Sequence, residues 1–185
     1  FMRMRDRVRD RERSLRESEA TLRTAMEAGA LSSFRWDIVT DAIHLEHPFR
    51  SMWHVPVGAR LDRATFLKGV HPSDRTRVEA AFFRPWNTRD YGYVLSEFRV
   101  CDPKTGAERW VSAHGRTIFH QDVPVALSGV LQDITDRKQA EEELRKSEAR
   151  YRLLFEGSPA PIWIIDIETL RLLDVNRAMA RSEEH

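Results

Sequence analysis

The sequence predicts an α+β protein, with a five-stranded antiparallel sheet, short helices on one face of it, and flanking N- and C-terminal helices of coiled-coil type. Two segments, one at the N-terminus and one after residue 136, carry apolar residues at alternating spacings of three and four, as coiled-coil helices do. Between them lie five predicted strands, and in the first two of these apolar and polar residues alternate, as in half-buried strands. A stretch with helical patterns separates the second strand from the third.

Composition narrows the classes of function. The chain of 185 residues has 30 basic and 29 acidic side chains, so it lacks the strongly basic character of a dedicated nucleic-acid-binding protein. Its one cysteine, Cys101, excludes an internal disulfide framework and any zinc or iron–sulfur site built on several cysteines. No run approaches the roughly 20 apolar residues that span a bilayer. We expect a cytoplasmic fragment of a longer protein, and the arginines after Phe1 also suit the flank of a membrane helix just upstream.

The chain contains an internal repeat, which predicts its domain organisation. A shift of 129 positions, without a gap, places Leu15 on Leu144, Arg23 on Arg152 and Asp37 on Asp166. The predicted parts are a helix over residues 1–27, a complete domain over 28–135, a linker helix over 136–156 and the truncated start of a second domain over 157–185. Because the second copy has too few residues to close a core, we expect it to be partly disordered or to borrow a partner surface.

The two opening helices predict a dimer seam. The three–four spacing places Val8, Leu15 and Leu22 on one face of the first helix, and Leu144 and Tyr151 on one face of the second. Arginines and serines interrupt both seams where a stable zipper has aliphatic side chains. We expect a weak parallel homodimer. The alternative is a solvated helix that packs only on its own domain.

Local patterns predict the strands. Residues 33–38 and 43–46 alternate in polarity around Thr40-Asp41, which predicts a hairpin. Three further strands are predicted at 92–101, 108–119 and 124–134, joined by turns at 102–106 and 121–122.

Helical signals lie between the hairpin and the later strands. Residues 48–70 predict short helices with loops. Ser73 or Asp74 is the expected N-cap of a helix that continues to about Phe83 and ends before Pro85.

Three motifs in these elements resemble the PAS domain family. Residues 129–141 (GVLQDITDRKQAE) are similar to its exit signature, in which an aspartate and a threonine join the last strand to a signalling helix. Residues 70–75 (VHPSDR) are similar to a His-Pro-x-Asp-Arg motif of one large subfamily of this family. An Arg-Trp-Val run like Arg109-Trp110-Val111 also recurs in that subfamily. The resemblance covers about residues 20–136 and restarts at about 149. It implies the PAS fold and a sensor module upstream of a histidine kinase, a diguanylate cyclase or a related output domain.

The exit from the last strand is the predicted signal-transmission site and consists of Asp133, Ile134, Thr135 and Arg137. Asp133 and Arg137 are four positions apart across the strand-to-helix boundary, so we expect them to pair, and Thr135 is expected to cap the helix. The resemblance implies that a change in the core becomes a movement of the helix here. The alternative is that Asp133 and Thr135 only terminate the strand.

The sequence contains no catalytic constellation: it has no nucleophile elbow, no phosphate-binding glycine loop and no cysteine with a matched base. His44 and His47 point to opposite faces of a strand, so no metal site is predicted. The Gly-x-Asn-Cys-Arg-Phe-Leu-Gln run of light-sensing flavin relatives is absent, which argues against a photoactive flavin. A haem needs an inward histidine. His54 and His71 are candidates, but we assign His71 to the start of a helix and expect no cofactor.

The candidate pocket between sheet and helices is lined by Trp36, Trp53, Phe66, Phe98, His114 and Ser128. Large aromatic side chains at strand spacing usually fill a core, so we expect a filled core and keep a small-molecule ligand as the alternative. The predicted function is sensory or signal-relay: a module of a two-component sensor histidine kinase that acts through a dimeric helix on a downstream domain of the same chain. The alternatives are a module of a diguanylate cyclase and a dimerisation scaffold without a ligand.

Overall fold

The computed structural model describes residues 2–47, 49–56, 58–83 and 92–182, with side chains described at residue 9 and from residue 11 onward. The chain divides into two compact units, one that ends at Thr135 and one that begins at Asp136. Among the helices of these ranges, none combines the length and the apolar character needed to cross a membrane.

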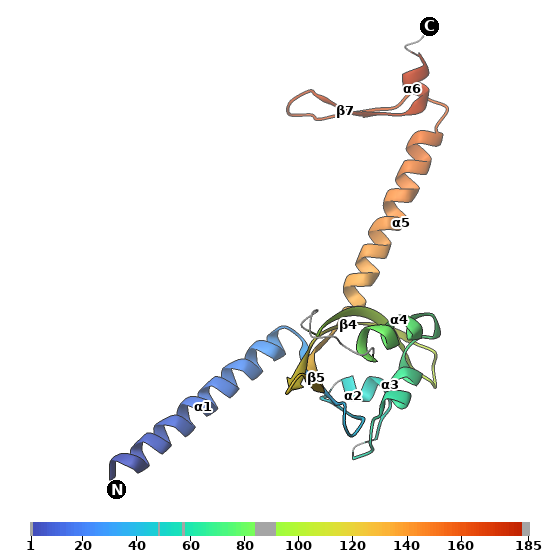
Figure 1. Ribbon diagram of the computed structural model, residues 1–185. Helices are drawn as coiled ribbons and strands as arrows, with labels where there is room; N and C mark the ends of the chain where they lie inside the picture. Colours follow the sequence, from blue (N-terminus) through green and yellow to red (C-terminus); the bar gives the residue numbers. More distant parts are fainter. Residues whose placement is uncertain (1, 48, 57, 84–91, 183–185) are drawn as a thin grey trace. The chain divides into compact units, whose positions relative to one another are not determined.

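The first unit contains a five-stranded antiparallel sheet in the order β2-β1-β5-β4-β3 (Figure 1). Its elements are α1 (Met2–Ala28), β1 (Leu31–Asp37), β2 (Ala42–Leu45), α2 (Phe49–Met52), α3 (Arg63–Gly69), α4 (Pro72–Phe83), β3 (Tyr93–Cys101), β4 (Glu108–His120) and β5 (Val123–Asp133). The three short helices pack on one face of the sheet, and the predicted fold class is confirmed. Helix α4 reaches Phe83, as predicted, and Pro85 lies outside the described residues.

The first hairpin forms where the alternation predicted it. Phe34 faces Leu45 across β1 and β2, and Trp36 faces Ile43, so four apolar side chains share the inner face. The turn is closed by the Asp37 carboxylate, which accepts the backbone N–H and the hydroxyl of Thr40, both at 2.8 Å.

Aromatic rings fill the space between the sheet and the short helices. Trp53 stacks on Phe66 with centroids 5.0 Å apart, and its indole N–H donates to the Phe66 carbonyl at 2.9 Å. Phe98 of β3 is fully buried, and the rings of Phe66 and Phe82 lie 6.2 and 5.9 Å from it. Edge and stacked contacts of this kind add to the stability gained from burial, so this cluster forms the centre of the core.

The prediction that Ser73 or Asp74 caps helix α4 is wrong. The helix begins at Pro72, and the Nδ1 atom of His71 accepts the backbone N–H of Ser73 at 3.2 Å. Proline suits the first helical position because its missing N–H needs no partner there. His71 thus acts as the cap, which agrees with its assignment to the start of a helix. The carboxylate of Asp74, in the first turn, binds Arg99 instead.

The second unit repeats the start of the first. Its elements are α5 (Thr135–Gly157, which begins on the last residue of the first unit), β6 (Trp163–Ile165), β7 (Leu172–Val175) and α6 (Arg177–Ser182). Ile165 pairs with Leu172, which is the Trp36–Ile43 pair shifted by 129 positions. The Asp166 carboxylate accepts the Thr169 N–H at 3.0 Å, as Asp37 does from Thr40. The sequence repeat is therefore also a repeat of turn chemistry and of the strand pair nearest the turn, whereas the register of the second hairpin shifts by one residue between Ile164 and Ile165.

Asn176, fully buried, organises the second unit. Its side-chain nitrogen donates to the carbonyls of Phe155 and Ala160 at 3.0 and 2.9 Å. Its side-chain oxygen accepts the N–H groups of Ile162 and Met179, and the latter bond caps α6. One amide thus joins the end of α5, the strand region and α6. The strands themselves leave apolar side chains exposed, including Trp163 and Leu172.

Candidate functional site

The predicted signal-transmission site is a hydrogen-bonded junction between β5 and α5. The Asp133 carboxylate accepts the backbone N–H of Thr135 at 3.0 Å and its hydroxyl at 2.5 Å. Arg109 of β4 donates to the other carboxylate oxygen at 3.1 Å. The last residue of the strand therefore holds both the first residue of the helix and a neighbouring strand.

Both backbone groups of Trp110 bind the same junction. Its N–H donates to the Thr135 hydroxyl at 3.0 Å, and its carbonyl accepts the N–H of Ile134 at 2.9 Å. The side chain of Ile134 is buried. The hydroxyl predicted to cap α5 thus accepts a bond from β4 and donates one to Asp133, so the start of the helix and two strands share one network.

Arg137 has a described partner on its own helix. Its guanidinium donates to Glu141 at 2.8 Å, at a spacing of four residues. Pairs of this kind stabilise a helix by a few tenths of a kcal/mol, ~0.2–0.5. The predicted pair between Asp133 and Arg137 stays a prediction.

A second ion pair connects helix α4 to this junction. The carboxylate of Asp74, which is 7% exposed, accepts two hydrogen bonds from Arg99, one from its backbone N–H and one from its side-chain Nε–H, both at 3.0 Å. The Arg99 guanidinium lies over the Trp110 ring, 5.5 Å from its centroid. Contacts thus run without interruption from α4 through β3 to the residue of β4 that holds Thr135.

The charge of Asp74 is stabilised in place. Burial by itself raises the pKa of the Asp74 carboxyl, but the hydrogen bonds and charge of Arg99, helped by Arg77, outweigh it and hold the pKa below its ordinary value of 3.8. A lowered folded-state pKa means that the pair stabilises the fold above the ordinary carboxyl range, and that this contribution is lost as the pH falls through the folded-state pKa.

Asp74→Asn is expected to lower the free energy of unfolding by about 1.5–3 kcal/mol at neutral pH, because the bonds to Arg99 lose their charged acceptor. The difference from the wild type should shrink as the pH falls from the ordinary carboxyl range through the lower folded-state pKa, where the wild-type carboxylate also becomes protonated. Urea titrations at a series of pH values measure this. Glu79→Gln, which breaks an exposed pair with Arg63, is the control and should cost less than about 1 kcal/mol. A difference that is constant down to pH 2 would contradict the role assigned to the charge.

The six candidate pocket residues lie on two faces of the sheet. Trp36, Trp53, Phe66 and Phe98 are buried among the helices. His114 is exposed and Ser128 half-buried, and both line a depression of about 520 Å³ on the opposite face. Their placement beside the aromatic core was wrong, because along β4 the inward positions are those of Val111 and Ala113. The structure does not bring the six together.

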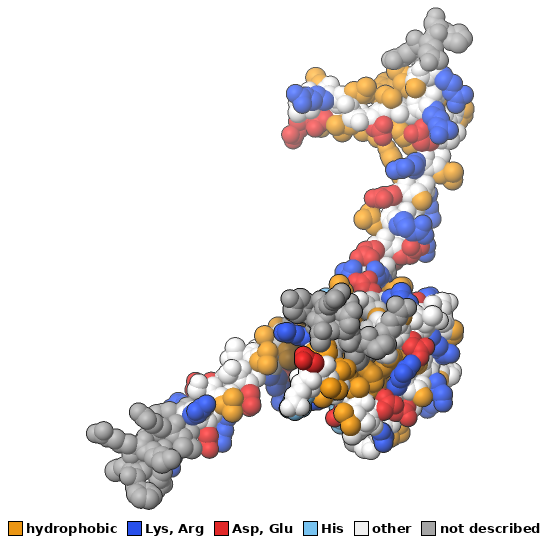
Figure 2. Space-filling view, viewed as in Figure 1, with side chains coloured by type: hydrophobic (Ala, Val, Ile, Leu, Met, Phe, Trp, Pro, Cys, Tyr) orange, Lys and Arg blue, Asp and Glu red, His pale blue; other side chains and the backbone are white. Residues whose placement is uncertain are grey.

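The seam residues of α1 and α5 are solvent-exposed in the single chain. Leu15 and Leu22 of α1 are 60% and 62% exposed, and Leu144 and Tyr151 of α5 are 62% and 48% exposed. The side chain of Val8 lies outside the described residues. Figure 2 shows hydrophobic side chains among charged ones along both helices. Apolar side chains repeated along an exposed helix face are available to a partner.

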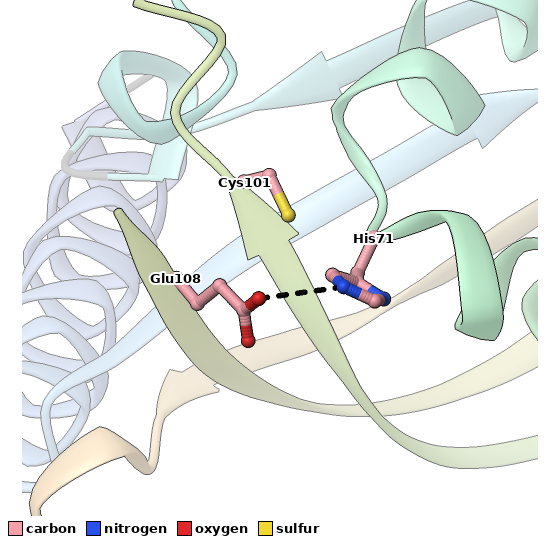
Figure 3. A group of neighbouring side chains, drawn as sticks. All are labelled: His71, Cys101 and Glu108. Atoms are coloured by element: carbon pink, nitrogen blue, oxygen red, sulfur yellow. Dashed lines mark ion pairs between the residues drawn. The ribbon is translucent and has the colours of Figure 1, made fainter. Parts of the chain in front are cut away.

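Two histidines near the β3–β4 turn bind carboxylates. His54 Nε2 lies 3.2 Å from Asp102, and His71 Nε2 lies 3.3 Å from Glu108. Cys101 is half-buried beside the second pair (Figure 3). Burial, and then the charge of Glu108, raise the pKa of the Cys101 thiol, so the thiol keeps its proton more readily than a free cysteine.

Sequence reasoning missed the partners that β4 and β3 supply to the junction. Arg109 and Trp110 were singled out only as part of a motif, although the antiparallel pairing of β4 with β5 places them opposite the strand exit. Asp74 was taken for a cap because aspartate is frequent there. Its bond to Arg99 spans 25 positions and has no local signal.

Two curated relatives of this chain have the names of sensor proteins. A sequence model described as "PAS domain" matches residues 149–181. The sensor protein FixL of Bradyrhizobium diazoefficiens is 28% identical over 145 residues, which cover 78% of this chain and 28% of that protein. The two-component sensor PprA of Pseudomonas aeruginosa is 33% identical over 114 residues, which cover 61% of this chain and 12% of that protein. The chain thus spans less than a third of these curated relatives.

A solved structure has the same architecture. The sensory box histidine kinase/response regulator from Burkholderia thailandensis superimposes with a TM-score of 0.54 at 26% identity, over 71% of this chain and 97% of that chain. The three sequence motifs, the strand order with its short helices, and these relatives agree. The chain therefore resembles the PAS domain family in its motifs and its fold, and its residues 149–181 match that family's sequence model.

Proposed function

We propose that this chain is the sensory or signal-relay module of a two-component sensor histidine kinase. It passes a conformational change through a dimeric helix to an output domain downstream in the same chain. The observation that carries the proposal is the junction at Asp133 and Thr135, where the first residue of α5 is bonded to the last residue of β5 and to β4. The names of the relatives, a sensor protein and a two-component sensor, support the kinase context.

The junction supplies a physical route for the signal. The Thr135 hydroxyl accepts the Trp110 N–H, so a shift of β4 against β5 changes the geometry at the start of α5. A helix is stiff over its length, and its heptad seam can pack in a small number of discrete ways. A small change in the sheet can therefore select between two arrangements of the helix pair.

The partner in the proposal is a second copy of the chain. Leu15 and Leu22 on α1, and Leu144 and Tyr151 on α5, would be covered in a parallel homodimer. In this scheme residues 1–27 and 136–156 are the dimerising helices, 28–135 is the sensing domain, and 157–185 begins a second domain. The module acts in the cytoplasm, and its core is filled by side chains.

An insertion series in α5 of the full-length protein tests the relay. Duplicating residues 137–143 adds seven residues and keeps the heptad phase, whereas duplicating only Glu142-Glu143 turns the downstream seam by roughly 200° at 3.6 residues per turn. We expect the two-residue insertion to change the rate of ATP-dependent histidine phosphorylation by about 5- to 150-fold, and the seven-residue insertion to leave it near the wild-type rate. Native mass spectrometry of each protein reports whether the dimer persists.

Equal phosphorylation rates in all three proteins would contradict the relay and favour a scaffold. A protein that phosphorylates no histidine but forms a cyclic dinucleotide from GTP would point to the cyclase alternative. A monomer in native mass spectra would remove the dimeric helix from the proposal.

A further inference from the structure

His71, Cys101 and Glu108 bring three kinds of metal-ligating atom together at one end of the sheet. A nitrogen, a sulfur and an oxygen from these side chains all lie within 4.8 Å of one another. Figure 3 shows them converging beside β3: Cys101 from the end of that strand, Glu108 from the start of β4 and His71 from the connection between α3 and α4. We propose that this cluster binds one divalent transition metal ion of the zinc class.

The backbone fixes all three positions. Cys101 and Glu108 are direct partners in the antiparallel register of β3 and β4, which holds their side chains close on one face. The His71 N–H donates to the Arg99 carbonyl at 2.9 Å, so the connection before α4 is bonded to the edge of the same strand. Ligands held by secondary structure need little reorganisation to bind an ion.

The distances suit a tetrahedral ion. Zinc bonds of about 2.0 Å to nitrogen and 2.1 Å to oxygen place these atoms about 3.3 Å apart at a tetrahedral angle. His71 Nε2 and Glu108 Oε1 are 3.3 Å apart. A thiolate at about 2.3 Å from the ion requires a sulfur–nitrogen separation of about 3.6 Å, and the sulfur lies within 4.8 Å of the other two atoms, so the Cys101 side chain has to approach by at most little more than 1 Å.

The surroundings orient one ligand and leave it partly exposed to solvent. Glu108 directs its other oxygen toward Arg99, 3.7 Å away, so Oε1 stays available while the carboxylate keeps a second partner. The Glu108 side chain is 44% exposed, which leaves a fourth coordination position to water. The mixed nitrogen, sulfur and oxygen set matches the ligands that zinc accepts.

Binding moves two protons, and one of them is diagnostic. The thiol releases its proton to solvent. The neutral His71 ring accepts the Ser73 N–H at Nδ1 and therefore carries its proton on Nε2. An ion on Nε2 requires the proton on Nδ1 and ends the bond from Ser73. The metal therefore replaces the cap of α4.

The test adds Zn²⁺ to the 185-residue chain after chelator treatment and measures affinity by competition with a chromophoric chelator. We expect one ion per chain, and an affinity at least about tenfold weaker in Cys101→Ser and Glu108→Gln. Long-range nitrogen NMR should show the His71 ring proton moving from Nε2 to Nδ1. With Co²⁺, the wild type should show a thiolate charge-transfer band in the near ultraviolet that Cys101→Ser lacks.

His54→Asn is the matched control. It removes the neighbouring histidine, which pairs with Asp102, and asparagine tolerates the positive φ of 51° at this position. Its affinity should equal that of the wild type, and urea midpoints show whether each variant is folded. The proposal is overturned if the wild type binds no stoichiometric Zn²⁺, if Cys101→Ser binds it equally well, or if the His71 ring keeps its proton on Nε2. This inference stands independently of the proposed signalling function.

Discussion

Replacing Phe98 with alanine is expected to lower the free energy of unfolding by about 3–5 kcal/mol, the loss measured when a buried aromatic ring leaves a cavity. Phe98 is fully buried, and the rings of Trp53, Phe66 and Phe82 lie 6.5, 6.2 and 5.9 Å from it. The helices and the sheet meet at this ring, so neighbours attached to separate elements cannot all move in to fill the space. Domains are stable by about 5–15 kcal/mol, so this loss is a large share of the total.

Urea unfolding followed by tryptophan fluorescence measures the change. Leu95→Ala on the same strand is the control, because Leu95 is 69% exposed and its loss should stay within about 0.5 kcal/mol. Phe98→Leu, a smaller truncation, gives an intermediate loss and covers the case in which the alanine variant does not fold. A loss below about 1 kcal/mol for Phe98→Ala would show that the ring borders a cavity that tolerates its removal. That outcome would favour the small-molecule ligand over the filled core.

Elements with a local code could be predicted from the sequence. The β1–β2 hairpin followed from strict alternation and from a turn in which Asp37 binds Thr40, four residues that need no distant partner. The same turn code recurs at Asp166 and Thr169, so the repeat is visible in the sequence, whereas the register shift between Ile164 and Ile165 in the second hairpin is not.

Features that depend on distant partners could not be predicted. Asp74 has the sequence context of a cap, but Arg99 of the edge strand offers it a charged partner, and the His71 ring takes the cap position. His114 was assigned to the wrong face because Val111, Ser112 and Ala113 are all buried, which hides the alternation of β4. The junction partners at Arg109 and Trp110 depend on the register of β4 against β5, which no local pattern specifies.

Asp133→Ala in the full-length protein is expected to change histidine phosphorylation by about 5- to 150-fold, the range of a typical coupling free energy, while the domain stays folded. The substitution removes the acceptor for the Thr135 N–H and hydroxyl and for Arg109. Hydrogen bonds to a charged group contribute about 1.5–3 kcal/mol, less than the stability of a typical domain. The helix would keep its length and seam but lose its bonded connection to β5.

Asp37→Ala is a closely matched control for this substitution. Asp37 also ends a strand, and its carboxylate accepts the N–H and hydroxyl of a nearby threonine, both at 2.8 Å, but its turn leads to β2 and not to α5. It should lower stability comparably and leave phosphorylation near the wild-type rate. Thr135→Val separates the contacts further, because it keeps the shape of the side chain and removes the acceptor for the Trp110 N–H.

The three variants distinguish signal transmission from stability. If phosphorylation follows the loss of stability, Asp37→Ala and Asp133→Ala will have equal effects, and the junction will only terminate the strand. If it follows the bonded connection, Asp133→Ala and Thr135→Val will change the rate together and Asp37→Ala will not. We expect the second pattern, because Asp133 and Thr135 share one hydrogen-bond network with β4 and a shift of that strand reaches the helix through both. A wild-type rate in both junction variants would remove this network from the mechanism.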